Sequence, residues 1–183
     1  MRTSNGPWHQ KIKWQINYHL RSLIILLIDK LSIPAKQTVL VKKLSKFDDF
    51  ELPEYQTDQA SGVDLRASIE SSLLIKPWEK ALIPTGISIS MPKGMEAQIR
   101  PRSGLALKHG ITVLNSPGTI DSDYRGEIKI ILINLSNNEF EINRNDRIAQ
   151  MVFAEISQVN FKEVNDLDDT LRGGKGFGST GNW

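Results

Sequence analysis

The sequence predicts an all-β domain, a barrel or a sandwich, and two observations carry that prediction. Short runs rich in β-branched residues recur along the chain, and several alternate apolar and polar positions with a period of two. Turn residues separate these runs, as at 76–77, 84–86 and 116–118. One stretch alone is typical of a helix, 103–108, and Gly110 is placed to end it.

The expected strands follow one another from about residue 38. Residues 38–41 form a β-branched run, and 62–67 and 86–91 alternate apolar with polar positions. Residues 127–134 begin by alternating and then turn wholly apolar, which predicts a strand that enters the core. Another apolar-rich run follows at 148–156.

Composition restricts the chemistry. The chain has 183 residues, 39% hydrophobic and 24% charged, which is typical of one soluble domain with an appendage. It has no cysteine, so a disulfide scaffold, a thiolate metal site and a cysteine nucleophile are excluded. The lack of cysteine fits a reducing compartment. With only three histidines, we do not expect a histidine-cluster metal site.

Residues 1–37 differ from the rest, and we interpret them as a poorly ordered N-terminal extension. Their apolar run, 23–28, is much shorter than the roughly 20 residues that a membrane-spanning helix needs. The basic stretch before it resembles a signal peptide, but Asp29 and Lys30 follow at once and no small-residue cleavage site appears. An amphipathic surface helix and a start codon placed too early are the alternatives.

Net charge divides the chain into two unlike parts. Nine basic side chains against one acid give +8 over residues 1–46, and the remaining 14 basic and 20 acidic side chains give −6 over 47–183. Such asymmetry hints at a nucleic-acid or membrane tail. The basic part, however, lies outside the region that carries the motifs described next. We therefore expect neither a nucleic-acid partner nor a membrane partner.

The first motif, Arg100–Leu105, has the features of an anion site. We expect Ser103 to be the N-cap of the short helix and Gly104 to let a ligand approach the backbone closely. Two arginines flank this helix start, and guanidinium groups bind phosphate well. The alternative is a capped turn whose arginines face solvent.

The second motif, Asn115–Gly126, places two carboxylates and a tyrosine between strands. A carboxylate held in a pocket here is able to take a proton from water. Taken alone, however, the segment is better explained by turn capping, with Tyr124 at the edge of the core.

The third motif, Arg172–Gly181, holds five glycines in ten residues. Backbone amides of such a segment can wrap phosphates, while Arg172 and Lys175 supply charge. The spacing is not that of a P-loop. Phe177 lies between glycines, where it is better placed to stack on a base than to join a core. A flexible glycine tail is the alternative.

Two smaller elements place Asp64 and Arg66 on one polar strand side, and Arg147 and Gln150 near another strand start. Each is commonplace alone. Together with the three longer motifs, they predict a nucleoside triphosphate site with hydrolytic chemistry and no covalent nucleophile.

In this order, the five segments resemble the five motifs of the trimeric deoxyuridine triphosphatases (dUTPases). The resemblance covers about residues 38–181. In chain order the five family motifs match 61–67, 101–110, 115–126, 147–150 and 172–181, and the matches at 101–110 and 115–126 are the most specific. It implies a distorted jelly-roll-like β-barrel with one short helix over 38–165 and a flexible glycine-rich arm over 166–183. It also implies a cytoplasmic homotrimer in which three subunits share each active site.

The resemblance further implies hydrolysis of dUTP to dUMP and pyrophosphate by water attack on the α-phosphorus, which limits uracil in DNA and supplies dUMP for dTMP synthesis. Asp121 matches the carboxylate that activates the water, and Tyr124 matches the aromatic ring under the deoxyribose. Asp64 matches a carboxylate that reaches Mg²⁺, the implied cofactor, through water. The other implied substrate contacts are Arg102, Ser103, Gly104, Asn115, Thr119, Ile120, Lys129, Gln150, Arg172, Phe177, Gly178 and Ser179.

The arm departs from the family pattern, because Lys175 stands where a glycine is usual. A non-glycine residue is awkward there if the backbone needs a positive φ, although its ammonium group would add a phosphate contact. Two rival functions remain on the same barrel: a dCTP deaminase, and a non-catalytic nucleotide-sensing module. The hairpin 119–124 favours the hydrolase.

Overall fold

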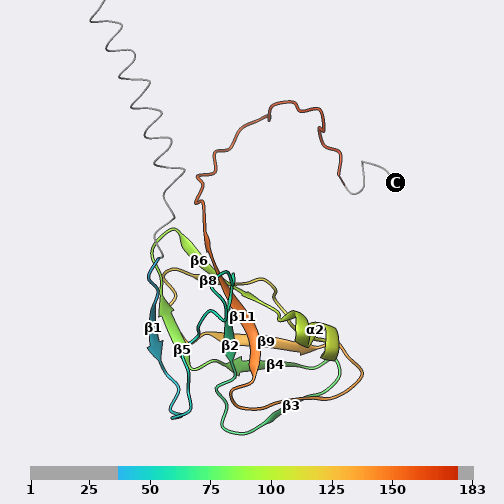
Figure 1. The fold of residues 1–183 in the computed structure, drawn as a ribbon. Helices are drawn as coiled ribbons and strands as arrows, with labels where there is room; N and C mark the ends of the chain where they lie inside the picture. The colour runs from blue at the N-terminus through green and yellow to red at the C-terminus, as the bar shows by residue number, and fades with distance from the viewer. Residues whose placement is uncertain (1–36, 177–183) are drawn as a thin grey trace, which may run out of the picture.

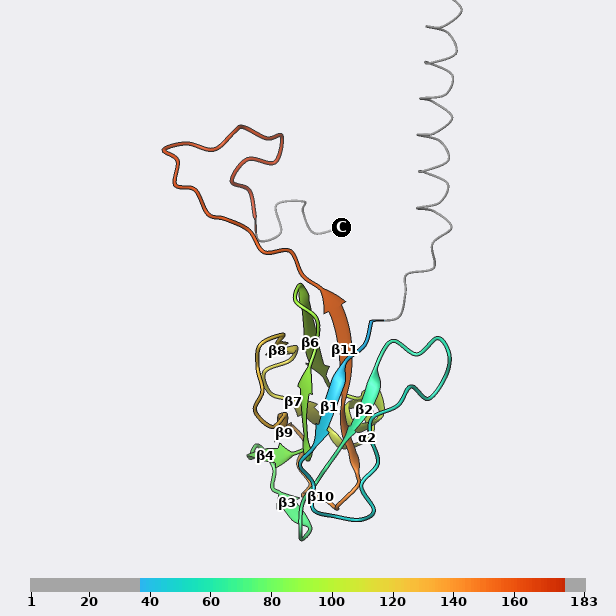
Figure 2. The same cartoon turned by 90° about the vertical axis from the view of Figure 1, so that its left-hand side faces the viewer.

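A computed structural model describes residues 37–176 of the chain (Figure 1). The predicted extension therefore lies outside the described residues except for Gln37, and so do Phe177, Gly178 and Ser179. Within the described part, strands dominate and a single helix is present, as predicted. The barrel is seen from two sides in Figures 1 and 2.

Two antiparallel sheets and two strand pairs make up the barrel. Each strand pairs with a partner distant in sequence, as in a jelly roll. The larger sheet has the order β2 (Val63–Arg66), β11 (Arg147–Glu155), β6 (Met95–Arg100), β8 (Gly118–Asp121). The smaller sheet has the order β4 (Lys80–Pro84), β9 (Lys129–Asn134), β7 (Ile111–Val113). The pairs are β1 (Leu40–Lys43) with β5 (Ile87–Ser90), and β3 (Leu73–Ile75) with β10 (Phe140–Ile142).

The core consists mainly of branched aliphatic side chains from the inner faces of these strands, among them Leu65, Ile83, Ile130 and Leu132. Burial of each such side chain is worth about 1.5–3 kcal/mol. Strand β9 confirms the prediction of a strand that enters the core, and it does so on one face only. Ile130 and Leu132 are buried, whereas Ile131 and Ile133 are half-buried and face outward. The strand alternates throughout, as expected when only one face of a sheet packs on the core.

Asn134, the last residue of β9, is a fully buried polar side chain whose hydrogen bonds are satisfied. Its amide nitrogen donates to Ile75 O at 2.9 Å and to Asn138 O at 2.7 Å. Its carbonyl oxygen accepts from the backbone N–H and the hydroxyl of Ser136, at 2.9 and 2.8 Å. One side chain therefore holds β3, β9 and the turn that follows β9 together.

Helix α2 (Ser103–His109) begins at the first residue of the predicted helical stretch, but its N-cap lies one residue earlier than predicted. The N-cap is Arg102, in extended conformation and without a side-chain capping bond, so the prediction of Ser103 as N-cap was wrong. The prediction for the other end is confirmed: Gly110 adopts φ 66° and its N–H reaches Ala106 O at 3.1 Å.

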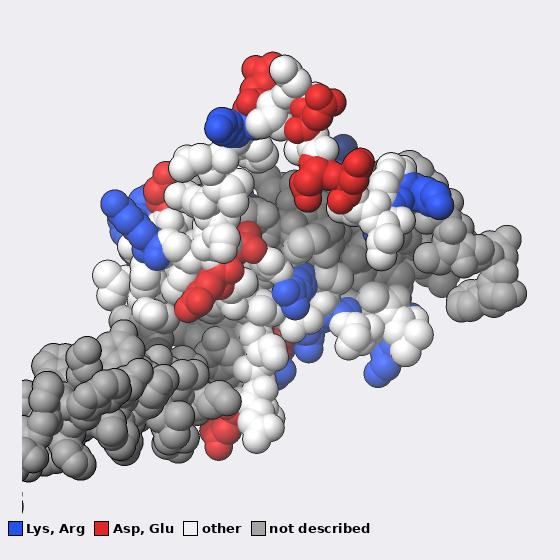
Figure 3. All heavy atoms as spheres, turned by 90° about the horizontal axis from the view of Figure 1, so that it is seen from above, with Lys and Arg blue, Asp and Glu red and all other residues white. Residues whose placement is uncertain are grey.

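After β11 ends at Glu155, the chain leaves the barrel as an extended segment (Figures 1 and 2). Residues 157–176 are exposed, and the Phe161 side chain is 97% exposed. Figure 3 shows Lys, Arg, Asp and Glu side chains interspersed on the described surface in the view from above. Within residues 37–176, no helix is long and apolar enough to cross a membrane.

Candidate active site

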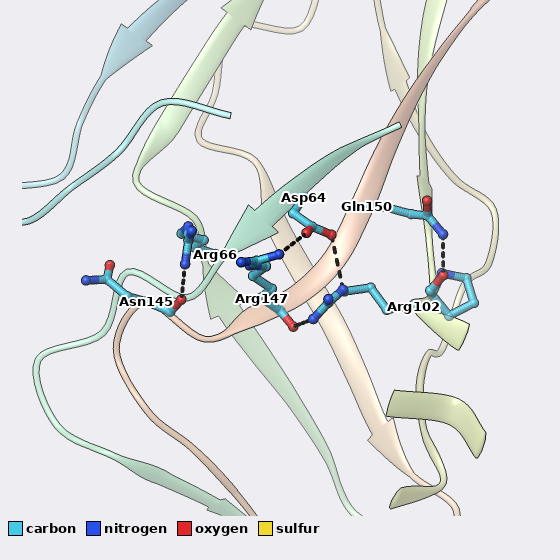
Figure 4. Close-up of polar contacts among 7 residues, drawn as sticks. Asp64, Arg66, Arg102, Asn145, Arg147 and Gln150 are labelled. Atoms are coloured by element: carbon cyan, nitrogen blue, oxygen red, sulfur yellow. Dashed lines mark hydrogen bonds and ion pairs between the residues drawn. The ribbon is translucent and has the colours of Figure 1, made fainter. Parts of the chain in front are cut away.

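Asp64 on β2 pairs with two arginines that come from distant parts of the chain (Figure 4). Its Oδ1 lies 3.1 Å from Arg102 Nε, and its Oδ2 lies 3.2 Å from Arg147 Nη1. Arg102 also donates to the carbonyl oxygen of Arg147 at 2.7 Å. The side chain of Asp64 is 20% exposed, so these partly desolvated ion pairs are stronger than fully exposed ones. We call Asp64, Arg102 and Arg147 the arginine cluster.

Strand pairing explains why these residues meet. Strand β11 lies between β2 and β6, with Gln150 opposite both Asp64 and Arg100. The Gln150 amide donates to Pro101 O at 2.9 Å and so ties the helix entrance to β11. Arg66, the arginine of β2 itself, stays apart: it donates to Asn145 O at 3.0 Å.

The helix entrance beside the arginine cluster is open. Ser103 and Gly104 are exposed, and a Cβ added to Gly104 would meet nothing within 4 Å. Packing inside this chain therefore does not require a glycine at that position. The free space, the first N–H groups of α2 and two guanidinium groups form a surface to which an anion can bind.

A second group of predicted residues lines a hollow of about 200 Å³ after β8. Its lining consists of Thr119, Ile120, Asp121, Tyr124, Glu127 and Lys129. Asp121 is exposed at the end of β8, and its carbonyl oxygen accepts the Tyr124 N–H at 3.1 Å. The Tyr124 hydroxyl donates to Glu127 O at 3.1 Å, which fixes the ring over the turn. We call this space the hairpin hollow.

Asn115 lies in the turn before β8, exposed and close to Gly118. A Cβ on Gly118 would come within 3.2 Å of Asn115 Nδ2 and 3.3 Å of Ile99 Cβ. A side chain at position 118 would therefore fit only if Asn115 and Ile99 moved by a few tenths of an ångström. Asn115 is not part of the hollow's lining.

The two groups remain separate within one chain. None of Arg102, Ser103, Gly104 and Gln150 lines the hairpin hollow. In the described part of the arm, Arg172 is exposed, and its side chain donates to Lys175 O at 3.0 Å. The non-glycine residues with positive φ among the described residues are Trp78 and Asn145, so Lys175 has an ordinary φ here.

Sequence reasoning missed Glu127 as a lining residue of the hollow. Its side chain lies 3.6 Å from Lys129 Nζ. A carboxylate two positions before a lysine in an extended segment places both on one side, so the pattern was available in the sequence.

Comparison with known proteins agrees with this barrel. Residues 48–181 match the dUTPase family model. The deoxyuridine 5'-triphosphate nucleotidohydrolase of Neorickettsia sennetsu is 60% identical over 133 residues, 73% of this chain and 89% of its own. That of Cytophaga hutchinsonii is 56% identical over 147 residues, 80% of this chain and 95% of its own.

Among solved structures, a mutant dUTPase of Staphylococcus bacteriophage 80alpha with dUpNHpp has a TM-score of 0.72. It is 27% identical, over 80% of this chain and 100% of the phage protein. The fold and these relatives thus define a nucleotide hydrolase built on a jelly-roll-like barrel. The chain belongs to the dUTPase family, and its reaction is the hydrolysis of dUTP to dUMP.

Proposed function

We propose that the arginine cluster and the helix entrance bind the triphosphate, and that the hairpin hollow holds the nucleoside. The observation that carries this proposal is the hairpin hollow, in which an exposed carboxylate, Asp121, stands beside a fixed aromatic ring, Tyr124. Arg102, Ser103, Gly104 and Gln150 then contact the phosphates. Two guanidinium groups against one carboxylate leave this side with net positive charge for a polyanion.

Asp121 is the general base. It takes a proton from water while the water oxygen bonds to the α-phosphorus and the bond to the α–β bridging oxygen breaks, which releases pyrophosphate. No ion pair with another described residue occupies its carboxylate, and it lies at the exposed end of β8. A positioned carboxylate base contributes about 10²–10⁴-fold to rate.

Tyr124 contacts the sugar of the nucleotide, and other residues near Tyr124 contact the base. The bond from its hydroxyl to Glu127 O holds the ring against the turn, so that a ribose 2′-hydroxyl lacks room above it. Thr119, Ile120 and Lys129 line the uracil end, and Asn115 contacts the base from the turn before β8. Arg172, Phe177, Gly178 and Ser179 close over the nucleotide from the arm, and Phe177 stacks on uracil.

Mg²⁺ is the cofactor that this site fits, bound chiefly by the substrate's phosphates. Within residues 37–176 no group of three or more His, Cys, Asp or Glu side chains could hold a metal. Magnesium usually keeps several waters and uses substrate phosphates in place of a protein cage. Asp64 accepts from two arginines, but a carboxylate has about four acceptor positions, so it can also accept from a metal-bound water. The ion would neutralise charge that develops on the phosphates.

The working enzyme is a homotrimer with shared sites. An apolar row crosses the outer face of the small sheet: Leu82 is opposite Ile131, and Leu114 bonds to Ile131 through its N–H. Leu82 is 58% exposed, and a row of exposed apolar side chains marks an interaction surface. Assembly through this face would also bring together site residues that one chain keeps apart. The enzyme is cytoplasmic and takes neither a nucleic acid nor a membrane as partner.

The test is the release of pyrophosphate by the purified full chain with Mg²⁺. Turnover of dUTP is expected to exceed that of UTP, dCTP and dTTP by orders of magnitude. Comparable turnover of UTP would contradict the role given to Tyr124. Ammonia release from dCTP would contradict the substrate assignment.

A further inference from the structure

Glu127 is a lining residue of the hairpin hollow to which the proposed chemistry gives no role. Its side chain is 25% exposed and makes two contacts. Oε1 accepts the Gly86 N–H at 3.0 Å, and Oε2 lies 3.6 Å from Lys129 Nζ. One carboxylate thus connects the exit of the hairpin to a separate turn of the barrel and to a cation of the hollow.

The backbone around Glu127 is fixed to the same turn. Ile128 donates to Ile87 O at 2.9 Å, and Ile128 O accepts from both the N–H and the hydroxyl of Thr85, at 3.2 and 2.6 Å. Gly86 has φ +70°, and a Cβ there would stand 2.7 Å from Ser45 Cβ, so the position favours glycine. Through these hydrogen bonds the turn 85–87 supports the hairpin exit.

Through this support, the position of Glu127 determines where Tyr124 stands. The Tyr124 hydroxyl donates to the carbonyl oxygen of Glu127 at 3.1 Å. A shift of the Glu127 backbone would carry that acceptor away and release the ring. Loss of the carboxylate would also leave the Lys129 ammonium group without this ion-pair partner.

We propose that Glu127 is a positioning residue that fixes Tyr124 and Lys129, and thereby sharpens discrimination between deoxyribose and ribose nucleotides. This inference rests on the proposed role of Tyr124 in reading the sugar. Glu127 itself does not touch the reacting atoms. Loss of the Glu127 side chain changes the placement of the tyrosine ring. It thereby lowers the ratio of kcat/KM for dUTP to kcat/KM for UTP.

The experiment measures that ratio, with kcat and KM separately, in a set of variants of the full chain. Glu127→Ala removes both contacts. We expect the ratio to fall about tenfold, mainly through a higher kcat/KM for UTP, because a released ring no longer excludes the 2′-hydroxyl; tenfold is the scale of one charge-assisted hydrogen bond. Glu127→Asp keeps the charge but shortens the reach to Gly86, and should lower the ratio similarly. It also serves as the second test if Glu127→Ala does not fold. Glu127→Gln keeps an oxygen for the Gly86 N–H and should restore most of the ratio.

Tyr124→Phe removes the hydroxyl alone. Combined with Glu127→Ala it should add little, because in this proposal Glu127→Ala acts by displacing the backbone carbonyl oxygen that accepts the Tyr124 hydroxyl. The matched control is Glu139→Ala, which removes an exposed carboxylate that forms no ion pair with another described residue. Its ratio should equal that of the unmodified protein. A purely structural role for Glu127 would change the amount of folded enzyme and leave the ratio unchanged.

A last variant, Tyr124→Ala, separates this inference from the function on which it rests. If Tyr124→Ala lowers the ratio while Glu127→Ala and Glu127→Asp leave it unchanged, the positioning role of Glu127 is overturned and the tyrosine keeps its role. If Tyr124→Ala leaves the ratio unchanged, the proposed role of the tyrosine falls as well.

Discussion

Asp64 Oδ1 lies 3.1 Å from Arg102 Nε, and this ion pair joins strand β2 to the entrance of helix α2. The same carboxylate contacts Arg147 on β11. Asp64 therefore fixes two guanidinium groups that the proposed function directs at phosphates. Its negative charge also lowers the repulsion between them.

Asp64→Asn is expected to raise KM for dUTP about tenfold, because an amide pairs with guanidinium groups much more weakly than a carboxylate does. Steady-state kinetics at saturating Mg²⁺ measure the change. The matched control is Asp58→Asn, because the Asp58 side chain is exposed and lies in a loop before β2. An unchanged KM in Asp64→Asn would contradict the positioning of the arginines by Asp64.

Asp121→Asn is expected to lower kcat by about 10²–10⁴-fold, because the amide cannot accept the proton of water. Nucleotide affinity should stay within a few-fold of its original value, since the hollow keeps its shape. Calorimetry with a non-hydrolysable analogue measures binding, and pyrophosphate release measures rate. Asp123→Asn, an exposed neighbour outside the hollow's lining, should retain activity. Retained activity in Asp121→Asn would remove Asp121 from the base role.

Leu82→Glu is expected to dissociate the proposed trimer, because it buries a charge in the apolar row of the small sheet. Light scattering coupled to size exclusion measures the mass, and activity should fall with it. The control is Leu74→Glu on β3, an equally non-conservative change at another exposed leucine. A trimer that survives Leu82→Glu would place the interface elsewhere.

Asn134→Ala is expected to destabilise the fold by about 3 kcal/mol, because several buried polar groups lose their partner at once. Chemical denaturation measures the free energy of unfolding. Asn137→Ala, in the exposed turn nearby, should change it by less than about 0.5 kcal/mol. Equal effects of the two changes would show that the Asn134 network contributes nothing specific.

Trp78→Gly is expected to raise stability by about 0.5–1 kcal/mol. Trp78 has φ 65° and is 67% exposed, so its side chain gains little from packing while its backbone is in the left-handed region. That conformation costs about 1–2 kcal/mol for a residue with a Cβ, and glycine's extra unfolded-state entropy offsets part of the gain. Trp78→Ala keeps the Cβ and should give no such gain in thermal denaturation. Equal stability of the alanine and glycine variants would contradict the backbone explanation.

The strands and the local motifs could be predicted from the sequence because both depend on neighbouring residues. Alternation located β2 and β5, and Gly110 located the end of α2. The cap at Arg102 could not be predicted in this way, because the backbone turns into the helix without any side-chain capping bond.

Contacts between strands that are distant in the chain could not be predicted from the sequence. Asp64 meets Arg147 only because β2 pairs with β11 in one register, and a shift by one residue would turn the carboxylate to the other face. The burial of Asn134 depends on partners from β3 and from the turn after β9. The separation of the arginine cluster from the hairpin hollow likewise follows from the closure of the barrel, which no local pattern encodes.

The exposed segment after β11 makes the chain selectively sensitive to proteases. Residues 157–176 have no strand or helix to protect their backbone, whereas the barrel is closed by paired strands. Exposed extended chain is the usual site of nicking. A cut beside Phe161 would leave every strand in place and remove Arg172 with the rest of the glycine-rich arm. Such a clipped protein would keep its melting behaviour while losing the residues proposed to close over the nucleotide, so intact mass must be checked before activities are compared.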